Sequence, residues 1–96
     1  MPERPRWTFL TSHGLVLLEV TRAPGATVRE IADRSGLTER QTHRVLADLV
    51  DDGYVMRERI GRRNHYRVDD SQPMRHPILT GHRIGELLAA LREPTA

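Results

Sequence analysis

The chain has 96 residues with no cysteine, 15 basic residues that are all arginine, and 13 acidic residues, for a formal net charge of +2. This length predicts one small domain, the lack of cysteine excludes disulfides and thiolate metal ligands, and no apolar run approaches the roughly 20 residues needed to cross a bilayer. Residues 1–7 are mostly polar, are interrupted by proline and lack a signal-peptide pattern, so we expect a cytoplasmic protein.

The first expected helix covers residues 12–22 and follows an amino-terminal arm, residues 1–11. Thr11 or Ser12 can cap this helix, and its apolar residues nearly surround it, which predicts burial on more than one side. Three large apolar residues precede the helix: Trp7, Phe9 and Leu10. Because a small domain has little surface with which to cover them, we expect them to contribute to a dimer interface.

A second, short helix is expected to end at Ser35, after a chain break at residues 23–26. Thr27 and Glu30 have the spacing of a capping box at its start, in which each side chain bonds the backbone N–H of the other residue. Gly36 can end the helix in the left-handed conformation. Only two residues then separate it from the next helix.

Residues 38–52 predict a third helix with two different faces. Thr38 and Gln41 form a second capping box, and Gly53 can end the helix. A buried stripe with helical spacing is formed by Thr42, Val45, Leu46, Leu49 and Val50. The opposite side of the first two turns carries Arg40 and Arg44, flanked by Gln41 and His43.

Arginine and glutamine are the side chains that make paired hydrogen bonds to guanine and adenine edges in a major groove. An isolated helix with this composition would be interpreted as an ordinary solvated helix. Here two short capped helices are joined by a turn that contains glycine, and the second has a polar, arginine-bearing face. This arrangement predicts a helix-turn-helix.

After Gly53 the hydrophobic period changes from 3.6 to 2, which predicts strands at residues 54–60 and 64–69. The connection is a hairpin loop in which Gly61 and Asn64 tolerate positive φ. Two pairs of side chains are expected to face the core, Met56 with Ile60 and Tyr66 with Val68. Residues 57–67 contain five arginines and one glutamate, so this hairpin is the most basic part of the chain.

Residues 70–79 contain two prolines and are expected to form an extended connector. Thr80 can cap a last helix within residues 80–93, whose apolar stripe comprises Ile84, Leu87, Leu88 and Leu91. Burial of these four side chains contributes about 6–12 kcal/mol gross, at about 1.5–3 kcal/mol each. The helix can pack on its own domain or on a second subunit, and we favour a homodimer because so small a domain leaves much apolar surface uncovered.

Residues 12–69 resemble the MarR and ArsR types of bacterial transcriptional regulator. The motifs that carry the resemblance are TVREIADRSGLT at 27–38, ERQTHRVLADLVDDGYV at 39–55 and RERIGRRNHYRV at 57–68. It implies a mainly α fold with a small β-hairpin (α+β), a winged helix-turn-helix with an added C-terminal helix. It further implies that the recognition helix, 38–52, enters the major groove of double-stranded DNA, at an inverted repeat, with the basic wing, 57–67, on flanking DNA.

Carried over by position, the resemblance implicates eleven residues in DNA binding: Thr27, Arg29, Thr38, Glu39, Arg40, Gln41, His43, Arg44, Arg62, Arg63 and Asn64. Glu39 departs from a basic pattern because it is acidic; it can accept a hydrogen bond from a cytosine amino group or reduce the affinity. Metal-sensing members of this type use cysteine and histidine clusters, but this chain has no cysteine and its five histidines lack tight ligand spacing. We therefore expect no metal or cofactor.

Three classes of function can be compared with these residues. A sequence-specific DNA-binding regulator accounts for both the basic wing and the arginine face of the third helix. The alternative is a winged-helix protein-interaction module without sequence-specific DNA binding. An enzyme is not expected, because the sequence has no nucleophile with a base and no glycine-rich phosphate loop, and its carboxylate pairs, Asp51–Asp52 and Asp69–Asp70, occur at the ends of elements.

Overall fold

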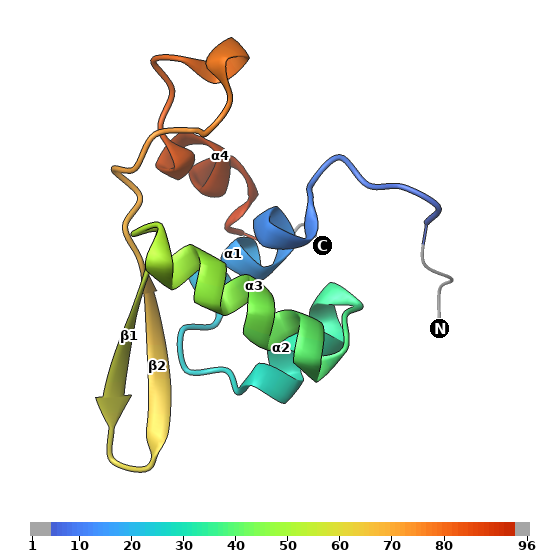
Figure 1. The fold of residues 1–96 in the computed structure, drawn as a ribbon, viewed down its shortest axis with the longest axis vertical. Coiled ribbons are helices and arrows are strands. Elements are labelled where there is room, and N and C mark those ends of the chain that lie inside the picture. Colours follow the sequence, from blue (N-terminus) through green and yellow to red (C-terminus); the bar gives the residue numbers. More distant parts are fainter. Residues whose placement is uncertain (1–4, 94–96) are drawn as a thin grey trace.

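Three helices, a β-hairpin and a fourth helix follow one another along the chain (Figure 1). The computed structural model describes residues 5–93. The elements are α1 (Ser12–Arg22), α2 (Val28–Ser35), α3 (Glu39–Asp51), β1 (Val55–Ile60), β2 (Arg63–Val68), the 3₁₀ turn η1 (Pro77–Leu79) and α4 (Ile84–Leu91). The predicted α+β fold class is confirmed. No helix within the described range is long and apolar enough to span a membrane.

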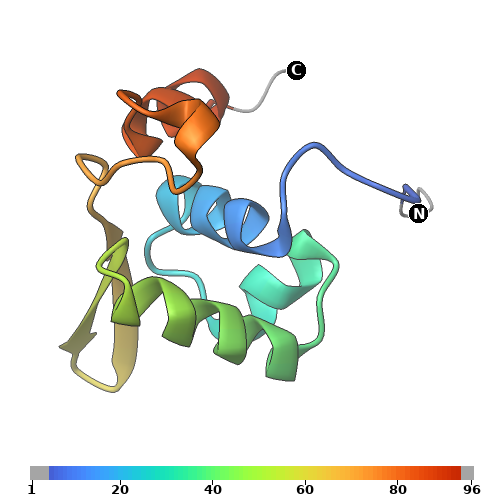
Figure 2. The same cartoon turned by 45° about the horizontal axis from the view of Figure 1, so that its top comes forward.

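The helix α1 is the centre of the domain and contacts α2, α3, β2 and α4. Figure 2 shows α1 between α4 on one side and the α2–α3 pair on the other. Its buried side chains are Val16, Leu17, Leu18 and Val20. Burial on more than one side, as the sequence predicted, follows from this position. Its first turn is capped by the Thr11 hydroxyl, which accepts a hydrogen bond from the Gly14 N–H at 3.2 Å.

The hairpin is an antiparallel pair with a two-residue loop. Ile60 pairs with Arg63, so Gly61 and Arg62 form the turn. Gly61 has φ +62°, and no residue other than glycine has positive φ among the described residues. Positive φ at the first loop position alone is what a type II′ turn requires. Asn64 belongs to β2, as the predicted strand at residues 64–69 had it, and pairs with Arg59; its predicted place in the loop was wrong.

The prediction for the inner face of the hairpin was half right. Tyr66 is buried as expected, but Met56 is 42% exposed and Ile60 54% exposed. Residues paired directly across two strands share a face, and Tyr66 is opposite Arg57 whereas Met56 is opposite Arg67. Met56 and Ile60 therefore lie on the other face. Val55, opposite Val68, supplies the buried residue of β1 instead.

The last helix begins at Ile84, four residues after Thr80, so the predicted cap at Thr80 was wrong. The Thr80 hydroxyl donates to the Pro77 carbonyl at 2.6 Å, within the turn that follows η1, and Gly81 has φ +89°. The connector is thus partly helical rather than fully extended. It also forms a single antiparallel bridge between Pro73 and Arg83, which places the first half of the connector against the start of α4.

Backbone carbonyls of the connector satisfy the first N–H groups of α4. The Ile84 N–H donates to Gln72 O at 2.8 Å, and the Gly85 N–H donates to Asp70 O at 2.9 Å. A Cβ atom on Gly85 would lie 2.7 Å from the same Asp70 oxygen, so this close approach requires glycine. The tertiary position of residues 70–72 therefore decides where the helix begins.

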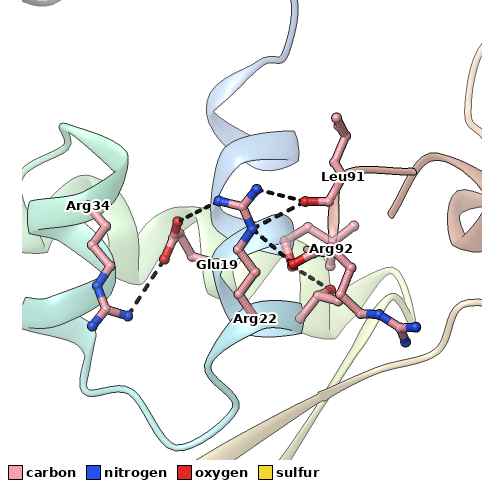
Figure 3. A network of polar contacts seen from close by, with 7 residues as sticks. Glu19, Arg22, Arg34, Leu91 and Arg92 are labelled. Atoms are coloured by element: carbon pink, nitrogen blue, oxygen red, sulfur yellow. Dashed lines mark hydrogen bonds and ion pairs between the residues drawn. The ribbon is translucent and has the colours of Figure 1, made fainter. Parts of the chain in front are cut away.

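The helix α4 packs on its own domain. Ile84 and Leu88 are buried within a single chain, whereas Leu87 and Leu91 are only partly buried. The Arg22 guanidinium at the end of α1 donates to the Leu91 carbonyl at 2.7 Å and to the Arg92 carbonyl at 3.2 Å (Figure 3). These bonds satisfy carbonyl groups at the C-terminus of α4 that have no partner within the helix.

Candidate nucleic-acid interface

The recognition-helix candidate, α3, is fixed by its cap and by its buried stripe. The Thr38 hydroxyl accepts from the Gln41 N–H at 3.0 Å, and the Gln41 side-chain oxygen accepts from the Thr38 N–H at 2.9 Å. The fully buried members of the stripe are Thr42, Val45, Leu46 and Leu49. Because this face is buried, Arg40, His43 and Arg44 are exposed on the outer side, as the periodicity predicted.

The capping box limits what Gln41 can do. A paired hydrogen bond to adenine needs both the amide oxygen and the amide nitrogen of a glutamine. In this structure the oxygen already accepts the Thr38 N–H. The oxygen has a second lone pair, but the closed cap fixes the direction of the amide, so Arg40 and Arg44 are the stronger candidates for contacts with base edges.

The two ends of α3 differ in charge. Its first turns carry Arg40 and Arg44, whereas Asp48, Asp51 and Asp52 lie at its C-terminal end. Asp48 bonds His13 Nε2 at 2.8 Å, and Asp52 forms an ion pair with Arg75, so α1 and the connector both hold this end. Glu39 is an exposed carboxylate in the first turn, but the two arginines outnumber it there. Since carboxylates repel phosphate, the first two turns suit a polyanion better than the C-terminal end does.

The wing tip carries Arg62 in the turn and Arg63 at the start of β2, and both side chains are exposed. In Figure 1 the tip projects from the bottom of the molecule, at the end opposite α4. Long cationic side chains at such a tip reach outward without displacing other parts of the fold. The predicted position of these two arginines at the end of a projecting hairpin is confirmed.

The start of α2 lies next to the wing tip. A groove of about 190 Å³ between them is lined by Thr27 and Val28 on one side and by Arg62, Arg63 and Asn64 on the other. The pKa of the Glu30 carboxyl is lowered, chiefly by the hydrogen bonds that it makes with the backbone and side chain of Thr27, and to a lesser extent by the positive charges of Arg34 and Arg63. The fold thus brings together two clusters that are more than 30 residues apart in the sequence.

A second groove, of about 150 Å³, connects α3 to the base of the hairpin. Its lining includes His43, Ala47 and Asp51 from α3 and Arg57 and Tyr66 from the strands. The sequence pattern placed Arg57 only within the basic ribbon. Its position opposite Tyr66, on the face that turns toward α3, depends on the strand register and has no signal in the sequence. The structure therefore adds Arg57 to the candidate interface.

Comparison with known protein families gives one match. The model of the MarR family matches residues 8–63, more than half of the chain. The chain belongs to the MarR family. The matched range contains α1, α2, α3 and β1 and ends at the wing tip, so it contains the recognition-helix candidate and its supporting helices. Comparison with curated proteins found no match.

MarR-family proteins are DNA-binding transcription regulators and not enzymes, and the site described above agrees with that class. The basic side chains lie on the first turns of α3, at the start of α2 and along the wing. Within residues 5–93, no cluster of three or more histidine, aspartate or glutamate side chains is arranged to hold a metal ion.

The apolar residues expected at a dimer interface have different surroundings in this MarR-family protein. Phe9 is 92% exposed and Trp7 63% exposed, whereas Leu10 packs against the core. The two aromatic rings contact each other edge to face, with centroids 4.9 Å apart. Because Ile84 and Leu88 are already buried in their own chain, Trp7 and Phe9 are the most exposed of the residues expected at the interface.

Proposed function

We propose that this MarR-family protein is a sequence-specific double-stranded DNA-binding transcription regulator, a cytoplasmic bacterial protein that acts as a homodimer on an inverted repeat. The observation that carries the proposal is that two grooves join the wing to the helices of the candidate site. One groove joins the α2 start to the wing tip and is lined by Arg62 and Arg63, and another joins the flank of α3 to the wing base and is lined by His43 and Arg57. The wing therefore presents arginines beside both α2 and α3.

In this proposal each element has a separate task on DNA. The first turns of α3 enter the major groove, where Arg40 and Arg44 contact base edges. The wing places Arg62 and Arg63 on flanking phosphates or in the minor groove. The other proposed contacts, near bases or phosphates at the edges of the site, come from Thr27, Arg29, Thr38, Glu39, Gln41, His43 and Asn64, together with Arg57.

The proposed homodimer follows from the size of the reading surface. One recognition helix reads only a few base pairs, so a single subunit has little power to select one site in a genome. Two subunits related by a twofold axis read half-sites about one helical turn apart. The surfaces proposed for pairing are the exposed arm, Trp7 to Leu10, and the partly exposed members of the α4 stripe, Leu87 and Leu91.

The alternative is a winged-helix protein-interaction module, and the exposed side chains of Trp7, Phe9 and Ile78 are the observation that favours it. Selection of bound sequences from a random DNA pool distinguishes the two functions, with light scattering on the same sample to count subunits. We expect enrichment of a short inverted repeat and a mass of two chains. No enrichment at any salt concentration would contradict the DNA-binding proposal and favour the alternative.

A further inference from the structure

Few side chains of this protein can read adenine. Paired hydrogen bonds to adenine need a side-chain amide, because adenine presents one acceptor, N7, and one donor, the N6 amino group, in the major groove. The chain has three amide side chains, Gln41, Asn64 and Gln72. Gln72 lies in the connector, where its amide nitrogen donates to Asp69 Oδ2 at 3.1 Å, and Asn64 belongs to β2 of the wing. Gln41 is thus the one amide on α3.

The capping box holds the Gln41 amide against the start of its own helix. The amide oxygen accepts the Thr38 N–H at 2.9 Å, and the Gln41 backbone N–H donates to the Thr38 hydroxyl at 3.0 Å. This pair of bonds fixes the direction of the amide. A paired contact with adenine needs the amide oxygen and nitrogen to point together at the base, so it would require the cap to open. The closed helix therefore offers no amide for adenine.

Two arginines occupy the outer face of α3 instead. Arg40 and Arg44 are one helical turn apart and exposed, and neither guanidinium has a hydrogen bond or an ion pair with another of residues 5–93. Arg22 and Arg34, by contrast, contact carbonyl or carboxylate oxygens within the domain. Figure 2 shows α3 on the side of α1 that is away from α4, at the outside of the molecule. Both free guanidinium groups can therefore pair with a base without breaking an internal bond.

Arginine selects guanine by the pattern of its hydrogen-bonding groups. A guanidinium has several N–H donors and no acceptor, and guanine is the base that presents two neighbouring acceptors, N7 and O6, in the major groove. Adenine places its amino group where the second N–H of an arginine would point, and thymine offers a single acceptor beside its methyl group. Guanine is therefore the base that accepts both bonds from one arginine.

Glu39 favours cytosine, the partner base of guanine. Its carboxylate is exposed at the first position of α3 and can only accept hydrogen bonds. Cytosine offers an amino donor with no acceptor beside it in the major groove, whereas in adenine N7 lies next to the amino group and repels the second carboxylate oxygen. His43, also exposed on this face, presents one ring nitrogen to a base at a time and forms no paired contact. The side chains able to select a base by paired groups thus agree on G·C pairs.

We propose that α3 reads G·C pairs, and that each half-site contains two guanines, one contacted by Arg40 and the other by Arg44. This inference rests on the proposed function and deepens it, because it names the bases that the site selects. The two arginines are four residues apart, which is about 6 Å along a helix, and stacked base pairs are roughly 3.4 Å apart. For a helix that lies along the groove, the two guanines are therefore about two base pairs apart.

Selection of bound sequences from a random DNA pool tests these base identities with the wild type and two variants. The wild type should enrich half-sites that contain two guanines at about this separation. Arg40→Gln and Arg44→Gln each replace two donors with an amide, so each should remove the preference for guanine at one position, a different position in each variant, and favour adenine there. The matched control is Arg83→Gln, the same change at an exposed residue that precedes α4, which should leave the selected sequence unchanged.

Base analogues test the same contacts with the wild-type protein, so the result does not depend on the folding of a variant. In the analogue 7-deazaguanine the N7 acceptor of the major groove is missing, whereas inosine keeps N7 and O6 and lacks the amino group that guanine presents in the minor groove. Replacing either contacted guanine with 7-deazaguanine should weaken binding, measured by fluorescence anisotropy, by about fivefold or more. Inosine at the same position should bind as tightly as guanine.

Three results would overturn this inference. One is an enriched sequence without two guanines in each half-site, which leaves the proposed function intact but means that α3 reads other bases. Another is a pair of guanines that both variants still select, or that 7-deazaguanine can replace without loss, because other side chains then read them or the contact is not at N7. The third is no enrichment at any salt concentration, which contradicts the proposed function itself and this inference with it.

Discussion

The wing offers the most direct test of how this protein contacts DNA. The change is Arg62→Ala together with Arg63→Ala, at a tip where both side chains are exposed. Removing one phosphate contact makes the plot of log affinity against log salt concentration less steep by about 0.9. If both arginines bind phosphate, the slope should change by about 1.8. Between about 50 and 200 mM salt, the wild type should then lose roughly tenfold more affinity than the variant.

Fluorescence anisotropy with a labelled copy of the preferred site, repeated at several salt concentrations, measures this slope. The matched control is Arg83→Ala with Arg92→Ala, which removes the same charge at the two ends of α4, the helix that Figure 1 shows at the opposite end of the molecule from the wing tip. We expect the control to keep the wild-type slope, because neither position faces the proposed interface. A wing variant that binds with the wild-type slope would refute the reasoning, since the tip would then have no contact with phosphate.

Three further predictions concern base reading, helix docking and the response to acid. Replacing Arg40 or Arg44 with alanine should cost about 1–3 kcal/mol per half-site on the preferred sequence and much less on random DNA; equal losses on both would show that these side chains hold phosphate. Leu88 is 4% exposed, so Leu88→Ala should lower the free energy of unfolding, measured in urea, by about 2–5 kcal/mol. If the loss is no larger than that caused by a substitution at an exposed position of α4, the helix is not docked. The pKa of Glu30 is lowered from its ordinary 4.5 by its bonds with Thr27, so its contribution to stability is complete above pH 4.5 and is lost as the pH falls through the folded-state pKa. Thr27→Ala keeps the backbone N–H, which is the larger cause, and removes only the hydroxyl, so it should raise this pKa part of the way toward the ordinary value in an NMR titration. An unchanged pKa would show that the hydroxyl does not contribute.

The helix-turn-helix was predictable because the interactions that define it are local. Thr27 with Glu30 and Thr38 with Gln41 are three residues apart, and both capping boxes are present in the structure. Helical periodicity is likewise set within a few residues, so the buried stripe of α3 and its exposed arginines followed from spacing alone. The predicted loop glycine, Gly61, also has positive φ as expected.

The errors arose where a side chain's environment depends on distant residues. The hairpin face of Met56 and Ile60 depends on the strand register, and a shift of one residue exchanges the two faces. The start of α4 depends on carbonyls of Asp70 and Gln72 that accept its first N–H groups. Neither can be read from a pattern inside one element.

Composition and spacing by themselves determined the helix-turn-helix, its caps, the basic hairpin and the outward arginines of α3, because each depends on residues within about one helical turn or one hairpin. Only the tertiary structure decided that Ile84 and Leu88 are covered by their own chain while Trp7 and Phe9 are not. It alone placed Arg57 beside α3 and Arg63 beside the start of α2. The physical reason is that the burial of a side chain and its distance from charged groups depend on which surfaces are in contact after the chain has folded. Sequence spacing does not specify those contacts.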